Sequence, residues 1–311
     1  MSYLLGQTLR GKSDIRIGVI GTRGQLARSL LEAADTRGIK SVALGRPALD
    51  LADRLSVNRA LDASSADIVV NAAAYTAVDQ AERDASAAFA INAAGAEHVA
   101  EACARLALPL IHISTDYVFD GMKPSPYLES DLTDPTTVYG RSKCEGEQQV
   151  AQTCPHHIIL RTAWLHSPFG HNFVKTMLRL ASEREQISVV DDQFGSPTYA
   201  LHLAEIILAI ADQLATGNAD PQWGIYHAAG EGYASWYELA EATFQASRAL
   251  GGPSAKVIKI PSSRYAAAAK RPMNSRLDGG KLARSFDLRL PHWRTGVDCG
   301  VTRLLSITRP H

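Results

Sequence analysis

The feature of this sequence that most constrains its fold is a regular alternation between short apolar runs and longer segments of helical period. The first run, Ile15 to Ile20, enters a glycine-containing turn, after which apolar residues recur every three or four positions. This alternation is typical of parallel strands joined by crossover helices. Later runs of the same character are Lys40 to Leu44, Asp67 to Ala73, Pro109 to Ser114, His157 to Thr162, Ile187 to Val190 and Gly224 to Ala228. The pattern predicts an α/β fold with a doubly wound parallel sheet.

Segments of helical period lie between these runs, namely Gln25 to Ala34, Ala81 to Leu106, Tyr139 to Gln152 and Thr198 to Leu214. Beyond Gly230 the alternation stops. Helical patterns follow near Trp236 to Leu250 and around Gly279 to Ser285, and the chain ends in an amphipathic stretch. We therefore expect a smaller, mostly helical C-terminal lobe beside the sheet.

A glycine turn joins the first strand to the first helix. Gly21, Gly24 and Ala27 have the spacing GxxGxxA, in which small residues let the backbone approach a pyrophosphate while the helix packs on the sheet. The helix N-terminus adds unpaired amides and a positive dipole. A glycine-rich turn can also be a tight connection without a ligand. Here strand, turn and helix occur in the order that dinucleotide binding requires, so we predict a Rossmann-type NAD(P) site that includes Gly21 and Gly24.

The residues after the second strand indicate which dinucleotide is preferred. An acidic side chain about 20 residues after the glycines would accept a hydrogen bond from the ribose 2′-hydroxyl of NAD. This chain has Gly45 and Arg46 there. Arg46 can pair with a 2′-phosphate, and Arg23 in the glycine turn can add a second positive charge. We predict NADPH as the cofactor, with NADH as an alternative; the argument fails if Arg46 is simply a solvated loop residue.

These expectations divide the chain into three parts. Residues 15–165, plus about 186–230, form the predicted NAD(P)-binding Rossmann domain. Residues from about 166 to 185 and from 231 to 311 form the predicted substrate-binding lobe. Residues 1–14 contain no apolar core of signal-peptide length and are expected to be a flexible tail.

Charge and cysteine content argue against several classes of partner. Thirty-two basic residues balance 32 acidic ones among 311, so no overall field favours nucleic acid or an anionic membrane surface. No stretch approaches the ~18 uncharged residues that a membrane-spanning helix needs. The four cysteines form no CxxC pair, and a chain of this length does not depend on disulfides. We expect a cytoplasmic protein with no nucleic-acid or membrane partner.

A tyrosine and a lysine four residues apart mark the candidate chemical centre. Tyr139 and Lys143 lie on one face of the predicted helix. A free tyrosine has a pKa near 10, and acid–base work near neutrality needs a downward shift of roughly 3 pH units, which a lysine and a nicotinamide cation both favour. In the reducing direction, hydride reaches a carbonyl carbon while Tyr139 donates its proton to the oxygen. Lys143 would also bond the nicotinamide ribose, and a hydroxyl in the run Ser114 to Tyr117 would polarise the carbonyl.

The YxxxK spacing by itself occurs by chance in many helices, where it is an exposed pair on a solvated face. Other signals occur in register with it: the GxxGxxA turn, Asn71 to Ala74 at the end of the third strand, and Ser114 to Asp116 at the end of the fourth. The carboxyl ends of parallel strands share one edge of the sheet, where such folds bind ligands. The combination favours a nucleotide-dependent carbonyl reductase.

With these motifs the sequence resembles the extended short-chain dehydrogenases and reductases, and within them the dTDP-4-dehydrorhamnose reductases. The resemblance covers nearly the whole chain from Ile15 onward. Its most specific strings are Asn71 to Glu82, Ser114 to Gly121, Tyr139 to Glu147, Arg161 to His166, Gly170 to Leu178, Asp191 to Thr198 and Arg271 to Asp278. The later strings are typical of the reductases rather than of the wider superfamily.

The resemblance implies roles for individual residues. The implied catalytic triad is Thr115, Tyr139 and Lys143. The residues implied around the sugar are Asp116, Tyr117 and Trp164. The implied cofactor contacts are Gly24, Gln25, Leu26, Asp50, Leu51, Ala73, Ala74 and Thr76. We further expect the C-terminal segment, with Asn274 and Arg276, to close over the nucleotide diphosphate.

The implied reaction is reduction of dTDP-4-dehydro-β-L-rhamnose to dTDP-β-L-rhamnose by NADPH, a step of dTDP-rhamnose biosynthesis. Magnesium and homodimer formation are features of some members of the family. The sequence contains no compact cluster of metal ligands, so it predicts no metal site. The sugar and its nucleotide rest on the resemblance alone.

Two other classes of protein remain as alternatives. The reductases resemble the regulatory subunit of methionine adenosyltransferase, so fold alone cannot decide between an enzyme and a regulator. The intact set of Thr115, Tyr139 and Lys143 favours an enzyme. The second alternative is another nucleotide-sugar epimerase, dehydratase or epimerase-reductase. A dehydratase needs further acid and base residues, and here Asp116 is not followed by Glu.

Overall fold

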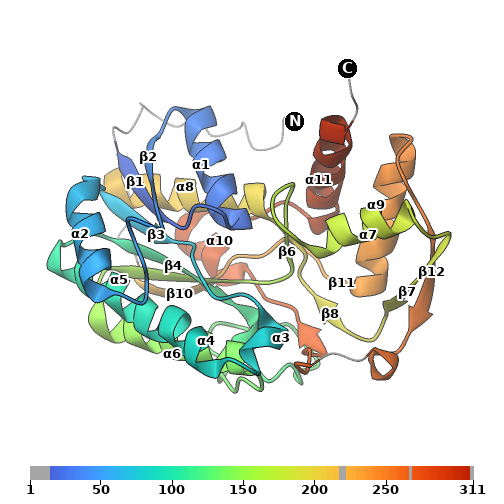
Figure 1. The fold of residues 1–311 in the computed structure, drawn as a ribbon, viewed down its shortest axis with the longest axis horizontal. Helices are drawn as coiled ribbons and strands as arrows, with labels where there is room; N and C mark the ends of the chain where they lie inside the picture. The colour runs from blue at the N-terminus through green and yellow to red at the C-terminus, as the bar shows by residue number, and fades with distance from the viewer. Residues whose placement is uncertain (1–14, 217–221, 266–267, 309–311) are drawn as a thin grey trace.

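The computed structural model describes residues 15–216, 222–265 and 268–308, so the expected tail at 1–14 lies outside the described residues. The main strands are β1 Arg16–Ile20, β2 Lys40–Leu44, β3 Ile68–Asn71, β4 Leu110–Thr115, β5 His157–Thr162 and β10 Gly224–His227. They form a six-stranded parallel sheet in the order β10-β5-β4-β3-β1-β2 (Figure 1). The predicted parallel sheet is confirmed.

Helices cover both faces of this sheet. One face carries α1 Gln25–Arg37 and α8 Ala200–Thr216; the other carries α2 Arg54–Ser64, α5 Gly95–Arg105 and α6 Val138–Thr153 (Figure 1). Successive strand residues alternate between the two cores: Val19 and Val70 pack with α1 and α8, whereas Ile20 and Val69 pack with α2 and α5. Burial on both faces explains why these strands are apolar almost throughout.

The strand order places a topological switch point beside β1. The chain passes from β1 to β2 on one side, then crosses to β3 on the other side and continues to β4 and β5. In such sheets the two crossovers leave a crevice outside the carboxyl ends of the strands, where ligands bind. The glycine turn after β1 and the segment Ala72 to Ala74 after β3 both border this crevice.

The prediction of one continuous helix from Ala81 to Leu106 is wrong. The structure has α3 Val78–Ala81, α4 Ala85–Phe89, a π-helical turn η1 Ala90–Ala94 and then α5. The break follows from Asp84, whose carboxylate accepts a hydrogen bond from Ala87 N at 3.2 Å and so caps a new helix. The apolar period continues across the break, so periodicity alone indicates one helix.

The predicted strand Ile187 to Val190 forms, but outside the main sheet. As β7 Gln186–Val190 it pairs in parallel with β12 Lys256–Ile260. The place beside β5 is taken by β10, and Ile187 and Val189 pack instead with Phe244 of α9 Trp236–Ala249. The expectation that this run joins the doubly wound sheet is therefore wrong. We propose that β7 belongs to the substrate-binding lobe and not to the Rossmann domain.

The remaining chain forms a smaller, mostly helical part, as predicted. Its helices α7 Phe173–Ala181, α9 and α11 Trp293–Thr308 share a core that includes Val297. Its short elements are β6 Leu165–His166, β8 Phe194–Gly195, β9 Thr198–Tyr199, β11 Ala234–Ser235, β13 Asn274–Ser275 and η3 Ser262–Arg264. A further short turn, η2 Asp116–Val118, directly follows β4 in the larger part. The expected helix near Gly279 forms as α10 Gly280–Phe286, which packs on the core of the main sheet. Within the described ranges, no helix is long and apolar enough to cross a membrane.

Candidate active site

A cleft of about 1430 Å³ opens at the switch point of the sheet. The predicted cofactor residues all line it: Gly21, Arg23, Gly24, Gln25, Leu26, Arg46, Asp50, Leu51, Ala73, Ala74 and Thr76. The predicted triad and sugar residues line it as well: Thr115, Asp116, Tyr117, Tyr139, Lys143 and Trp164. Residues that are far apart in the sequence therefore meet in one cavity.

The turn after β1 is shaped to hold a diphosphate. Gly21 has φ +116°, a conformation that side chains rarely adopt, and a Cβ there would stand 3.2 Å from Ala27 Cβ. Gly24 precedes α1, and no described side chain caps that helix. The amides of its first turn are therefore available to phosphate oxygens, with the helix dipole in support.

Arg46 and Asp50 form an ion pair at the cleft. Arg46 Nε lies 3.0 Å from Asp50 Oδ2, and Nη2 donates to Oδ1 at 3.1 Å. This hydrogen bond lowers the pKa of Asp50. A side chain at Gly45 would meet Thr22, because a Cβ there would lie 2.9 Å from Thr22 Cγ2. The residues present thus suit a 2′-phosphate better than recognition of a ribose hydroxyl by an acid at position 45.

Asn92, which the sequence analysis missed, supports the cleft without lining it. It lies in the π-helical turn η1, and its carboxamide clamps the segment after β3. Oδ1 accepts from Tyr75 N at 2.8 Å, while Nδ2 donates to Tyr75 O and to Ser142 Oγ, both at 3.0 Å. Because Ser142 lies on α6, Asn92 connects the cofactor segment to the helix that carries Tyr139. A π-helical turn often marks a functional site, but nothing in a single sequence announces one.

Helix α6 packs closely against the segment after β4. Thr137 caps its N-terminus by accepting a hydrogen bond from Gly140 N at 3.0 Å. A Cβ at Gly140 would lie 2.2 Å from Tyr117 O, so a side chain here would displace the helix. The Tyr139 ring consequently stands edge-on to Tyr117, with ring centroids 5.5 Å apart and an interplanar angle of 75°.

Tyr139 is buried in the wall of the cleft, and burial raises the pKa of its hydroxyl. A hydrogen bond with Thr115 acts in the opposite direction but is the smaller effect, and the nearby Asp116 again favours the protonated phenol. The direction is opposite to the predicted lowering, which also assumed a bound nicotinamide cation, because burial outweighs the other effects on this hydroxyl. Tyr139 therefore carries its proton at neutral pH, which is the form that a proton donor requires.

The Lys143 ammonium reaches from α6 to strand β4. Nζ donates to Ile113 O at 2.7 Å and lies 3.2 Å from His112 Nε2. Burial lowers the pKa of Lys143 to about 8. The sequence analysis missed His112. The available signal was a polar residue inside an apolar strand, just before the run Ser114 to Asp116.

Thr115 and Asp116 form a hydrogen-bonded pair beside Tyr139. Thr115 Oγ1 donates to Asp116 Oδ1 at 3.0 Å. Burial raises the pKa of Asp116 to about 6, opposed by hydrogen bonds from Ser275 and Thr115. Ser275 belongs to β13, so a strand of the C-terminal part touches the site here.

Trp164 is fixed in the wall of the cleft. Its ring stacks on Trp236, with centroids 3.5 Å apart and an interplanar angle of 9°. A Cβ at Gly195 would fall 2.4 Å from Trp164 Cε2, so the glycine leaves room for the indole. A flat apolar wall of this kind suits a deoxysugar. The role of Trp164 in sugar binding stays a prediction.

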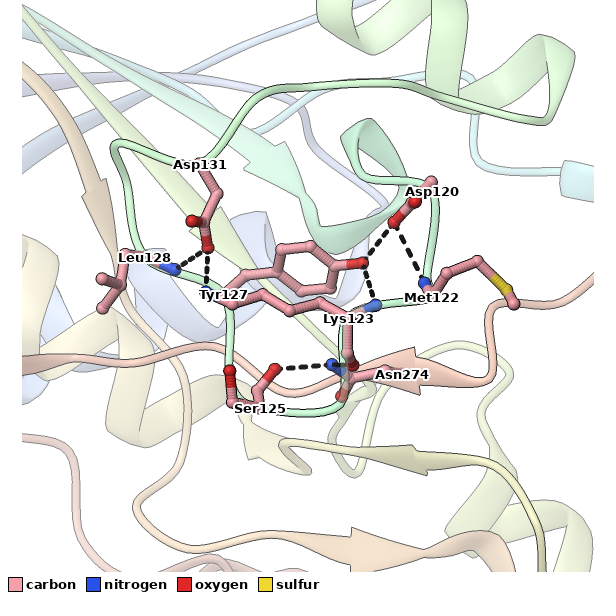
Figure 2. A network of polar contacts seen from close by, with 8 residues as sticks. All are labelled: Asp120, Met122, Lys123, Ser125, Tyr127, Leu128, Asp131 and Asn274. Atoms are coloured by element: carbon pink, nitrogen blue, oxygen red, sulfur yellow. Dashed lines mark hydrogen bonds and ion pairs between the residues drawn. The ribbon is translucent and has the colours of Figure 1, made fainter.

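Asn274 and Arg276 are not among the residues that line the cleft. The Asn274 carboxamide donates to Lys123 O at 2.7 Å and to Ser125 O at 2.8 Å (Figure 2). Arg276 donates to Pro124 O at 2.6 Å and, through Nε, to Asn274 Oδ1 at 2.7 Å. Both side chains brace the loop after β4, and their direct contact with a substrate stays a prediction.

The described part of the chain contains neither a cluster of metal ligands nor a disulfide. No group of three or more His, Cys, Asp or Glu side chains there is arranged to hold a metal ion. The four cysteines are free; Cys103, Cys144 and Cys154 are buried and Cys299 is exposed.

A tyrosine and a lysine one helical turn apart, facing a cleft at the switch point of a parallel sheet, place this chain in the class of extended short-chain dehydrogenases and reductases. The family model described as RmlD substrate binding domain matches residues 15–306. A dTDP-4-dehydrorhamnose reductase of Sinorhizobium fredii is 46% identical over 279 residues, 90% of this chain and 94% of the relative. The chain belongs to the dTDP-4-dehydrorhamnose reductase family.

Two further comparisons agree with this membership. A dTDP-4-dehydrorhamnose reductase of Aggregatibacter actinomycetemcomitans is 40% identical over 290 residues, 91% of this chain and 97% of the relative. The crystal structure of dTDP-4-dehydrorhamnose reductase from Bacillus anthracis in complex with NADP is similar with a TM-score of 0.86 and 34% identity. That similarity covers 94% of this chain and 100% of the other.

Proposed function

We propose that this protein reduces the 4-keto group of dTDP-4-dehydro-β-L-rhamnose to give dTDP-β-L-rhamnose, with NADPH as the reductant. The observation that carries the proposal is the cleft at the switch point, which joins the glycine turn to Thr115, Tyr139 and Lys143. Relatives that share 40% and 46% of their residues with this chain carry the name of this activity. The reaction is a step of dTDP-rhamnose biosynthesis.

The chain supplies a binding group for each part of the cofactor. The free amides at the start of α1 would hold the diphosphate, and Arg23 and Arg46 would pair with the 2′-phosphate. The adenine side would be bordered by Asp50 and Leu51, and the nicotinamide ribose would meet Lys143. When bound, NADPH supplies the hydride. NADH remains an alternative, because Arg46 is already paired with Asp50.

Tyr139 would be the proton donor. Its hydroxyl is protonated at neutral pH because it is buried, so Oη can transfer a proton to the substrate oxygen as negative charge develops there. The Lys143 ammonium, one helical turn away, favours the phenolate that remains. Thr115 can donate to the same substrate oxygen only when its hydrogen leaves the Asp116 carboxylate. Asp116 would thus control whether Thr115 acts as a donor.

The direct test supplies the purified protein with dTDP-4-dehydro-β-L-rhamnose generated in situ by the upstream enzymes. We expect loss of NADPH absorbance in equal amount to the product, and a product that is heavier than the substrate by two hydrogens. An epimerase would give an isomer without net NADPH consumption, and a regulatory protein would give no product. Either of these results would refute the proposal.

We also propose that the protein works in the cytoplasm, as a homodimer, and without a resident metal. Light scattering on the purified protein tests the dimer. Assays with and without a chelator test for a metal requirement, since turnover that falls in the chelator and returns with magnesium would contradict the proposal.

A further inference from the structure

Lys143 reaches the sheet at a point where two acceptors of β4 meet its ammonium. Nζ donates to Ile113 O at 2.7 Å and lies 3.2 Å from His112 Nε2. An ammonium group has three N–H donors, so these two contacts leave one. Lys143 also lines the cleft, and the third donor is therefore the one that remains for a ligand there.

The His112 ring is fixed at both of its nitrogens. His112 is 1% exposed. Its neighbour Ile111 faces the core of α1 and α8, so His112 faces the side of the sheet that α6 covers. In the parallel pairing of β3 with β4 His112 lies opposite Asn71, and Nδ1 is 3.2 Å from Asn71 Nδ2. Asn71 Oδ1 accepts in turn from Ala73 N at 3.3 Å, which connects the ring to the cofactor segment.

Lys143 is the charged member of its contact with His112, and the imidazole is neutral. Burial holds the pKa of His112 well below its usual value, and Lys143 and His157 of β5 act in the same direction. On its own helix Lys143 faces Glu147, which raises the Lys143 pKa, but the Glu147 carboxylate is already paired with Arg161 of β5. A neutral imidazole has one acceptor nitrogen, and the adjacent ammonium selects Nε2 for this role. Nδ1 then carries the hydrogen, which requires the Asn71 carboxamide to turn its oxygen toward the ring in exchange for the 3.3 Å contact with Ala73 N.

We propose that His112 is a positioning residue of the reductase. Its Nε2 accepts a hydrogen bond from Lys143, keeps the ammonium charged at the sheet, and thereby directs the remaining N–H into the cleft. His112 does not line the cleft and acts only through Lys143. The inference rests on the proposed function, because it assumes that Lys143 holds a ligand during the reaction.

Two variants separate the acceptor from the bulk of the side chain. His112→Gln keeps an amide oxygen close to the place of Nε2, whereas His112→Leu fills similar space without an acceptor. His227→Gln is the matched control, since His227 is equally buried but stands against Phe119 at the end of β10. If His112→Leu does not fold, His112→Asn takes its place, because the shorter side chain brings no acceptor to Lys143.

The first readout needs neither substrate nor cofactor. Lysine labelled with ¹³C at Cε is followed by NMR through a pH titration, and Lys143→Arg assigns the Lys143 signal. The wild-type ammonium should titrate near a pKa of about 8. Loss of an acceptor disfavours the charged form, so we expect the pKa to fall by about one pH unit in His112→Leu and to stay within ~0.3 units in His112→Gln and His227→Gln.

The second readout is the pH dependence of kcat for NADPH oxidation with the keto-sugar. In His112→Leu we expect kcat to fall about tenfold, while KM for the sugar changes less than about threefold. We also expect the decline of kcat on the basic side of its pH profile, the basic limb, to move to lower pH. His112→Gln should restore most of kcat and the wild-type limb. A residue needed only for packing would not move the limb, and Gln and Leu would then lose activity in proportion to their melting temperatures.

Two results would overturn the inference. One is a Lys143 pKa that is unchanged or raised in folded His112→Leu. The other is an equal loss of kcat in His112→Gln and His112→Leu, with the basic limb of the kcat–pH profile unchanged. Failure of the proposed function looks different, because the wild type would then not oxidise NADPH with the keto-sugar, or Lys143→Met would turn over normally. The NMR titration would still report on the contact itself.

Discussion

Glu147 and Arg161 form an ion pair that is enclosed between α6 and β5. Arg161 Nη2 donates to Glu147 Oε2 at 2.6 Å and Nε donates to Oε1 at 2.9 Å. The two side chains are 4% and 2% exposed, respectively. The guanidinium also stands over the Phe119 ring, 4.9 Å from its centroid. The pair anchors on the sheet the helix that carries Tyr139 and Lys143.

Removal of the Glu147 carboxylate should therefore be costly. Glu147→Ala leaves a buried guanidinium without a counter-charge, and we expect the free energy of unfolding to fall by about 3–5 kcal/mol. The matched control is Glu183→Ala, which breaks an exposed ion pair with Arg179 and should cost less than about 1 kcal/mol. Urea unfolding of both variants measures the difference. Similar losses of unfolding free energy in the two variants would show that the buried ion pair stabilises the protein no more than the exposed one does.

Asp116 should make stability depend on pH. Burial raises the pKa of Asp116 to about 6 in the folded protein, above that of the unfolded chain, so the folded state binds this proton more tightly. The stabilising effect of that proton is complete below about pH 4 and is lost as pH rises through about 6. Asp116→Asn cannot ionise, so at pH 8 we expect it to raise the free energy of unfolding by about 1–3 kcal/mol, with little gain at pH 4.

Thermal or urea unfolding at the two pH values checks this expectation. Asp35→Asn, a change at an exposed carboxylate on α1, serves as the control and should show no such difference. An equal effect of Asp116→Asn at both pH values would mean that Asp116 does not titrate between them.

Gly140 should not tolerate a side chain. A Cβ at this position would lie 2.2 Å from Tyr117 O and 3.0 Å from Pro135 Cβ, so α6 must move away from the segment after β4. We expect Gly140→Ala to cost about 1–3 kcal/mol of stability, as overpacking does, and to lower kcat because Tyr139 moves with the helix. Gln148→Ala, an exposed change on α6, should leave both quantities near wild type. Normal turnover of Gly140→Ala would show that the close approach is not required.

Arg46 should set the preference between the two dinucleotides. Arg46→Ala removes the side chain proposed for the 2′-phosphate, so we expect the ratio of kcat/KM for NADPH to that for NADH to fall about tenfold or more, as loss of a charge-assisted hydrogen bond would cause. Arg54→Ala, which removes an arginine paired with Glu101 away from the cleft, is the control. An unchanged ratio in Arg46→Ala would remove Arg46 from cofactor recognition.

The sheet and the cofactor side of the cleft could be predicted because their signals are local. The turn from Gly21 to Ala27 requires particular residues at fixed spacing, and the strands around it have to be apolar on both faces. β7 shows the limit of such signals. Its apolar pattern fits a strand in either sheet, and only the packing of Ile187 and Val189 on α9 decides where it pairs.

The polar support of the site could not be predicted, because it depends on partners from different elements. Asn71 meets His112 only when β3 and β4 pair in register. The spacing of Tyr139 and Lys143 places them on one face of a helix, but it does not show that the ammonium turns to Ile113 O. The predicted lowering of the Tyr139 pKa is not found, because burial of the hydroxyl outweighs the other effects on it.

The central claim is that Tyr139 donates the proton in the reduction of a keto-sugar, and one comparison tests it most directly. NADPH oxidation with dTDP-4-dehydro-β-L-rhamnose is measured for the wild type, Tyr139→Phe and Tyr226→Phe. Tyr226 is the control because it is also buried, on β10, but its hydroxyl donates to Gln222 O just before that strand. We predict that Tyr139→Phe loses about 10²-fold or more in kcat while it still binds NADPH, and that Tyr226→Phe turns over nearly as the wild type does. Turnover of Tyr139→Phe at the wild-type rate would contradict the account.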